Sequence, residues 1–185
     1  MPLYFSSEDI TKATTDAIVN AANTLLRNYA LRRGGGVCGA IFRAAGHAQM
    51  QAACNRIGGC ETGKAVITEG FALPARYVIH AVGPEYKPGD LDQRALLRES
   101  YLSALDIAMK HQLHSVTFPL ISSGIYGYPK EEALEIALDA IGDFLRDSGD
   151  ALEVTLCLMD SGLLRDAQDW AARRGGEGTE QTGKL

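Results

Sequence analysis

The sequence has neither an excess of positive charge nor a long apolar run. Its 185 residues include 18 Lys and Arg against 23 Asp and Glu, which gives a formal net charge of −5 at pH 7. Non-specific binding to nucleic acid depends on excess Lys and Arg, so we expect no nucleic-acid partner. No apolar run reaches the roughly 18 residues that a membrane span needs. The N-terminal stretch "MPLYFSSEDITK" lacks the regions of a signal peptide, so we expect a cytoplasmic chain without a membrane partner.

Cysteines are few, and their spacing excludes two common uses. The closely spaced pairs of a zinc site are missing among the four cysteines, which are Cys38, Cys54, Cys60 and Cys157. Cys54 and Cys60 are also too far apart for a C-x-x-C redox motif. We therefore expect reduced thiols, no bound metal and no cofactor.

Two common nucleotide-binding motifs are missing as well. No glycine-rich loop carries the lysine of a G-x-x-x-x-G-K-[ST] phosphate loop, and no G-x-G-x-x-G follows the first predicted strand. These absences disfavour nucleoside triphosphate hydrolysis and dinucleotide redox chemistry.

The sequence does contain short apolar runs that alternate with stretches of helical period. Strands are predicted at 2–6, 17–21, 64–70, 76–83, 115–122 and 152–159. Helices are predicted at about 38–57, 93–111, 130–148 and 163–174, and the third has a buried stripe of Leu134, Leu138, Ile141 and Leu145. This alternation predicts an α/β domain over residues 1–174, with a mostly parallel central sheet and helices on both faces. Residues 175–185 are almost free of apolar side chains and are predicted to be a disordered tail.

Two glycine-containing loops follow predicted strands and precede predicted helices. Gly34, Gly35 and Gly36 can adopt positive φ, so their N–H groups can converge on a phosphate or a sugar. The second loop spans residues 119–129 and contains small or permissive residues together with Tyr126. Its aromatic ring can pack on a sugar or cover the core. An anion-binding cradle and a plain flexible turn both fit the glycines alone.

In this order and spacing, the blocks "EDITK", "DAIVNAAN", "GGGVCGAIFRAAG", "TGKAVIT", "YVIHAVGP" and "ISSGIYGYP" closely resemble a macrodomain of the hydrolytic, MacroD-like kind. The resemblance runs from about Leu3 to about Asp160. It implies a monomeric three-layer α/β/α fold, with a mixed sheet of six or seven strands and a cleft for ADP-ribose or an ADP-ribosylated protein.

The same resemblance implies roles for individual residues. Asp9 would accept a hydrogen bond from the adenine amino group beside the Ile10 N–H, although without the resemblance a turn or N-cap role is the better interpretation of Asp9. Asn23 would bind the distal ribose, whereas Asn20 and His80 would be structural. The remaining ligand-binding positions are Gly34, Gly35, Gly36 and Val37 at the distal ribose and phosphate, Ser122, Ser123, Gly124, Ile125 and Tyr126 in the diphosphate loop, with Tyr126 lining the distal ribose, and Met159 near adenine.

The sequence departs from the family at the catalytic position. The hydrolytic macrodomains read G-G-G-V-D-G-A-I-H, and here Cys38 and Phe42 replace the aspartate and the histidine. A thiol is a poor general base, so Cys38 either packs as a small side chain or reacts as a thiolate stabilised by the helix N-terminus. Without the carboxylate, Asn23, the glycine-loop amides and the ligand diphosphate would position the attacking water.

The expected function is therefore binding of ADP-ribose and hydrolysis of its conjugates, either mono-ADP-ribosylated proteins or O-acyl-ADP-ribose. The alternatives are a reader that binds without turnover and a phosphatase acting on ADP-ribose-1''-phosphate.

A loop at 24–33 is about five residues longer than the family pattern. It adds Arg27, Arg32 and Arg33, which either attract an acidic partner or form a solvated surface. We refer to residues 24–33 as the insertion.

Overall fold

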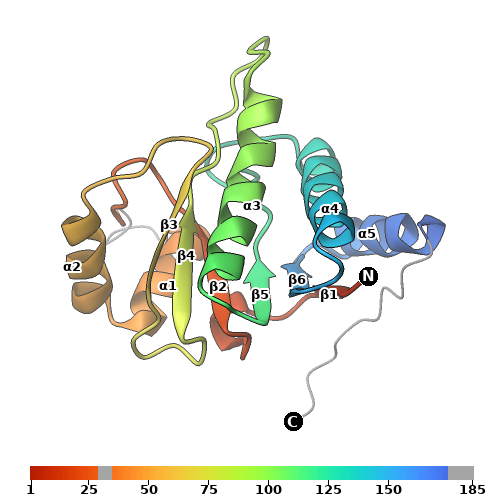
Figure 1. The fold of residues 1–185 in the computed structure, drawn as a ribbon. Coiled ribbons are helices and arrows are strands. Elements are labelled where there is room, and N and C mark those ends of the chain that lie inside the picture. Colours follow the sequence, from red (N-terminus) through yellow and green to blue (C-terminus); the bar gives the residue numbers. More distant parts are fainter. Residues whose placement is uncertain (29–34, 175–185) are drawn as a thin grey trace.

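The computed structural model describes residues 1–28 and 35–174. Its centre is a six-stranded sheet in the order β1-β6-β5-β2-β4-β3 (Figure 1). The strands are β1 (Leu3–Ser6), β2 (Ala17–Ala21), β3 (Ala65–Glu69), β4 (Tyr77–Ala81), β5 (Ser115–Phe118) and β6 (Glu153–Cys157). β3 pairs antiparallel with β4 at one edge, and every other pairing is parallel. All six predicted strands are confirmed, and the sheet is mixed and mostly parallel as expected.

The helices cover both faces of the sheet. They are the short η1 (Ile10–Lys12), α1 (Gly36–Ala45), α2 (His47–Ile57), α3 (Gln93–Lys110), α4 (Lys130–Asp147) and α5 (Ser161–Arg173). The prediction of one helix over about 38–57 is wrong. Gly46 separates α1 from α2 with φ and ψ both at 97°, a conformation that glycine tolerates because it has no Cβ. The other three predicted helices are confirmed to within two residues at each end.

Two apolar clusters give the three-layer architecture. One cluster joins α3, α4 and α5 to one face of the sheet, and it contains the predicted stripe of Leu134, Leu138, Ile141 and Leu145. The second joins η1, α1 and α2 to the opposite face and includes Ile18, Val78 and Phe42. The two faces of the sheet therefore hold different helices, as Figure 1 shows, and the α/β/α prediction is confirmed.

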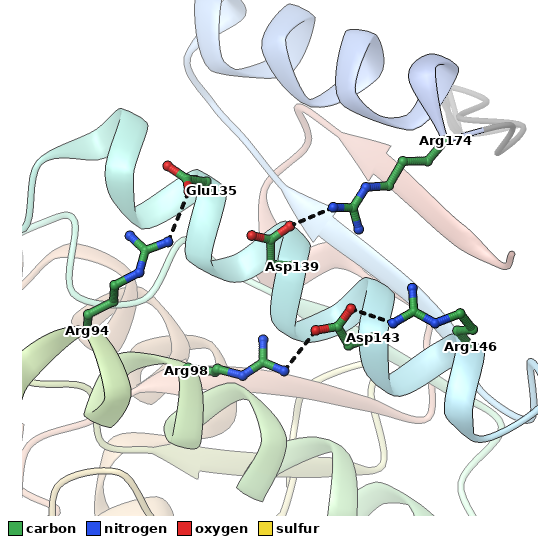
Figure 2. Close-up of polar contacts among 7 residues, drawn as sticks. All are labelled: Arg94, Arg98, Glu135, Asp139, Asp143, Arg146 and Arg174. Carbon is green, nitrogen blue, oxygen red and sulfur yellow. Dashed lines mark hydrogen bonds and ion pairs between the residues drawn. The ribbon is translucent and has the colours of Figure 1, made fainter.

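Ion pairs lie on the outer surface of the α3, α4 and α5 layer (Figure 2). Arg94–Glu135 and Arg98–Asp143 join α3 to α4, Arg174–Asp139 joins the end of α5 to α4, and Arg146–Asp143 lies within α4, with N···O distances from 2.7 to 3.2 Å. Each partner is at least one-third exposed, so each pair contributes only about 0–1 kcal/mol to stability. The packing of this layer depends mainly on the apolar stripe beneath these pairs.

The predicted tail, residues 175–185, lies outside the described residues. Within the described ranges, no helix is long and apolar enough to cross a bilayer.

Candidate functional site

The carboxyl ends of β1, β6, β5 and β2 lie side by side, in that order, at one edge of the sheet. The loops that follow these strands contain, in the same order, Asp9, Met159, residues 122–126, and Asn23 with the glycine loop. Ligands of open α/β sheets bind at this edge. The fold therefore arranges the predicted positions in one row, from the adenine end to the distal ribose end.

β2 and β5 separate before they reach this edge. Their ladder contains only Ala17↔Val116 and Ile18↔Thr117, whereas β2 pairs with β4 over its whole length, from Ala17 to Ala21. The chain also reverses direction across the sheet here, because β3 and β4 lie on one side of β2 while β5 and β6 lie on the other. Such a switch point is the usual ligand position in this class of sheet.

At the β1 end, Asp9 is the N-cap of η1. Its Oδ1 accepts hydrogen bonds from the Thr11 N–H at 2.9 Å and from the Thr11 hydroxyl at 2.8 Å. These two bonds hold the pKa of the Asp9 carboxyl below its usual value. The capping role of Asp9 is thus confirmed, and its contact with adenine stays a prediction. Ile10 is buried in the α1/α2 layer, and Met159 is 74% exposed on the loop after β6.

Asn23 does not project freely toward a ligand. Its Nδ2 donates to the Arg27 carbonyl at 2.6 Å, and its Oδ1 accepts from the Arg27 N–H at 3.2 Å. On the other side of this turn, Gln51 of α2 donates to the Leu26 carbonyl and accepts from the Asn28 N–H, both at 3.1 Å. The first part of the insertion is therefore fastened to α2. Each bond uses one of the two hydrogen-bonding positions on its atom, so Asn23 keeps one donor and one acceptor position for a ribose.

The described part of the glycine loop has the conformation that the sequence predicted. Gly35 precedes α1 with φ of 63°, and Gly36 has φ of 55°. Most L-residues avoid this region because of their Cβ, so glycine is favoured here. The first turn of α1 is not capped by a described side chain, and its N–H groups are available to an anion. Val37 is 37% exposed at this end, while Gly34, Arg32 and Arg33 lie outside the described residues.

The loop after β5 contains a strained, buried serine. Ser122 has φ of 66° and is 5% exposed, and its Oγ has no hydrogen-bond partner among the described residues. A Cβ on Gly83, just beyond β4, would collide with this Oγ. Ser123 instead stabilises the loop, because its hydroxyl donates to the Leu120 carbonyl at 2.8 Å. Sequence reasoning missed Gly83, whose bare Cα makes room for Ser122.

Two exposed positions complete this loop. Ile125 is 86% exposed and Gly124 is exposed at the loop tip. Gly127 closes the tip with a bond from its N–H to the Gly124 carbonyl at 3.0 Å and has φ of 69°. The loop is thus fixed by its own backbone, while its tip faces outward.

Tyr126 is held in the β5 loop by the loop after β4. Its carbonyl accepts the Tyr86 N–H at 2.8 Å. Burial raises the pKa of the Tyr126 hydroxyl, and the nearby carboxylate of Glu85 raises it further. The phenol is therefore neutral near neutral pH.

Cys38 is a neutral thiol in this environment. Burial raises its pKa above the usual value for cysteine, and a hydrogen bond from Asn20 Nδ2 to Sγ at 3.6 Å offsets this only in part. Of the two alternatives for Cys38, this raised pKa favours a packed thiol over a thiolate. The described residues contain no group of three or more His, Cys, Asp and Glu placed to hold a metal ion.

His80 is fully buried, and burial lowers its pKa to about 4. Its Nδ1 lies 3.1 Å from Asn20 Nδ2, and its Nε2 lies 2.9 Å from Thr68 Oγ1. A neutral, enclosed imidazole has the structural role that we expected for His80. Sequence reasoning missed Thr68, which meets His80 only because the two residues project from neighbouring strands onto the same face.

Comparison with known proteins agrees with this geometry. Residues 19–137 match the Macro domain family. The chain is 46% identical over 163 residues to the ADP-ribose glycohydrolase MACROD1 of Mus musculus, covering 85% of this chain and 49% of that protein. It is 47% identical over 156 residues to O-acetyl-ADP-ribose deacetylase 1 of Pantoea vagans, covering 83% of this chain and 88% of that enzyme.

A solved structure shares the fold closely. A point mutant of the Oceanobacillus iheyensis macrodomain with ADPR superposes with a TM-score of 0.82 at 36% identity, covering 91% of this chain and 92% of that one. The chain spans only about half the length of MACROD1, so the match concerns its macro domain region. The family match, the sequence identities and the shared fold all lead to one conclusion: this chain belongs to the macrodomain family.

Proposed function

We propose that this chain binds ADP-ribose along the carboxyl edge of its sheet. Adenine would lie between Asp9 and Met159, the diphosphate against the loop at 122–126, and the distal ribose beside Gly35 and Asn23. The observation that carries the proposal is the order of the strands β1, β6, β5 and β2. The four loops that follow them would meet adenine, the diphosphate and the distal ribose in the order in which these groups are joined in ADP-ribose. The relative solved with ADPR supports the choice of ligand.

We further propose that the chain hydrolyses ADP-ribose conjugates without a protein carboxylate at position 38. The relatives named ADP-ribose glycohydrolase and O-acetyl-ADP-ribose deacetylase support this class of reaction. In removal of ADP-ribose from a protein, the bond between the anomeric carbon and the carrier oxygen breaks, and the carrier leaves with that electron pair. Water then supplies hydroxide to the anomeric carbon, and its proton goes to the released carrier.

The raised pKa of Cys38 makes a thiolate base a poor explanation for this step. The α1 amides and the ligand diphosphate would instead hold the water next to the anomeric carbon. Fixed dipoles and close positioning stabilise a cation-like transition state without a strong base. Asn23 would join them through the second hydrogen of its Nδ2.

One observation favours a second function. A neutral thiol stands at position 38, and the strand order supports the assignment of the other loops to ADP-ribose. A non-catalytic reader of ADP-ribose would have these features.

The experiment that separates the two functions uses two substrates, a mono-ADP-ribosylated carrier protein and O-acetyl-ADP-ribose. Bound and released ADP-ribose are followed in parallel, with a protein-free reaction as the control. Release by the wild type above the level of this control supports hydrolysis. Binding without release supports the reader, and neither binding nor release contradicts both.

A further inference from the structure

A polar row lies inside the otherwise apolar layer between the sheet and helices α1 and α2. Asn20 of β2 is 1% exposed, His80 of β4 is 0% exposed, and Thr68 of β3 is 8% exposed. Asn20 and His80 are direct partners in the β2–β4 ladder, and their neighbours in this layer include Phe42 and Cys54. Burial of three polar side chains is costly unless they bond to one another, so the direction of each hydrogen bond matters.

The amide of Asn20 fixes the first direction. Its Nδ2 can only donate, so His80 Nδ1, 3.1 Å away, acts as the acceptor. A neutral imidazole carries one N–H, so the proton of His80 lies on Nε2. Thr68 Oγ1, 2.9 Å from Nε2, then accepts this N–H and donates its own proton to the Glu69 carbonyl at 3.1 Å or to Met50 Sδ at 3.4 Å.

Asn20 matches this tautomer. Its Nδ2 lies 3.1 Å from His80 Nδ1 and 3.6 Å from Cys38 Sγ, and its two hydrogens serve these two acceptors. Its Oδ1 is buried without a hydrogen-bond partner among the described residues. The Asn20 amide therefore points its Nδ2 at His80 and Cys38. Its Oδ1 loses its hydration without gaining a hydrogen bond, which costs stability.

We propose that Asn20 is a positioning residue: its amide, oriented by the Nε2–H tautomer of His80, holds Cys38 as a hydrogen-bond acceptor at the start of α1. The direction of donation runs from Asn20 to His80 to Thr68 on one side and from Asn20 to Cys38 on the other. Because Cys38 Sγ accepts the N–H of Asn20, its own S–H proton is free to be donated to a different group. The inference rests on the proposed function only in placing residue 38 beside the ligand.

The first test reads the tautomer of His80 directly. Nitrogen-15 NMR of the imidazole ring, in the full chain without ligand, distinguishes Nε2–H from Nδ1–H and from imidazolium. In the wild type we expect Nε2–H for His80 from pH 6 to 8. In Asn20→Asp, an acceptor replaces the donor, so the His80 proton should move to Nδ1 or the ring should become imidazolium.

Asn55→Asp is the matched control for this change. Asn55 is exposed on α2, and its Oδ1 accepts from Gln51, a role that a carboxylate also fills. It should leave the His80 signals unchanged. An Nδ1–H tautomer in the wild type overturns the proposal, and this result does not depend on whether Asn20→Asp folds. An unchanged tautomer in a folded Asn20→Asp also overturns it.

The second test measures the effect on Cys38. The pH dependence of Cys38 alkylation, followed by mass spectrometry of its peptide, is compared in the wild type and in Asn20→Ala. Loss of the N–H donor should move the alkylation midpoint of Cys38 to higher pH and leave that of Cys60 in place. A purely structural role would instead loosen the site, so Cys38 would react faster with an unchanged midpoint, and that outcome overturns the proposal. Neither test uses ADP-ribose, so failure of the proposed function would leave both interpretable.

Discussion

Asn23 holds the backbone of Arg27 from both sides. Its amide donates to the Arg27 carbonyl at 2.6 Å and accepts from the Arg27 N–H at 3.2 Å. The residue that the family resemblance assigns to the distal ribose is therefore engaged by the insertion. Each bond uses one of the two hydrogen-bonding positions on its atom, so a bound ribose would either share this amide with the turn or compete with it.

The first prediction concerns this competition. Asn23→Ala should reduce turnover of an ADP-ribosylated carrier at least tenfold, because it removes the group that is to position the ribose and the water. Gln51→Ala releases the insertion from α2 but keeps Asn23, so its turnover should equal or exceed that of the wild type. Rates of ADP-ribose release decide the matter. If Gln51→Ala loses as much activity as Asn23→Ala, the side chain of Asn23 acts only through the insertion.

The second prediction concerns the glycine cradle. Gly35→Val should abolish ADP-ribose binding, since a branched Cβ blocks close approach and disfavours the φ of 63°. Gly89→Val is the matched control, because Gly89 has φ of 86° and open space around its Cβ position, in the loop between β4 and α3. Both variants should lose about 1–2 kcal/mol of stability. Binding that survives in a folded Gly35→Val means that the cradle is assigned wrongly.

The third prediction concerns Cys38. Because its pKa is raised, the thiol stays protonated near neutral pH, and turnover should not rise through a thiol titration between pH 6 and 8. Cys38→Ala should keep turnover within a few-fold of the wild type. A pH–rate profile of both proteins tests this. Loss of all activity in Cys38→Ala, together with a wild-type rate that climbs with pH, would establish thiolate catalysis instead.

The fourth prediction concerns stability at mildly acidic pH. The pKa of His80 falls from 6.5 to about 4 on folding, so the unfolded chain binds this proton first as the pH drops. The contribution of neutral His80 is complete above pH 6.5 and is lost progressively toward pH 4, with about 2 kcal/mol gone by pH 5. Urea unfolding of the wild type and His80→Gln at pH 8 and pH 5 measures it. The wild type should show the larger loss, and equal losses would contradict a depressed pKa.

The fold was predictable from the sequence because each element carries a local signal. The stripe of Leu134, Leu138, Ile141 and Leu145 identified α4, and short β-branched runs identified the strands. The break at Gly46 was missed because a glycine inside a helical pattern can either continue the helix or end it. Whether the helix continues through Gly46 or ends there depends on tertiary packing.

The candidate site was predictable only as a set of positions. The resemblance and the strand order agree on which loops meet, but the state of each side chain depends on neighbours that are distant in sequence. Burial raises the pKa of Cys38, where the sequence left a packed thiol and a thiolate open, and the contact between Asn20 and His80 depends on strand register. The contact between Asn23 and Arg27 was equally hidden, because the insertion departs from the family pattern.

The account depends most directly on whether the chain binds ADP-ribose at all. Calorimetric titration of ADP-ribose into the wild type, with AMP as the comparison ligand, should give a dissociation constant in the micromolar range or tighter, about −8 kcal/mol or better. AMP should bind much more weakly, since it cannot reach the loop at Gly35. An absence of heat and of any thermal shift at millimolar ADP-ribose would contradict the account.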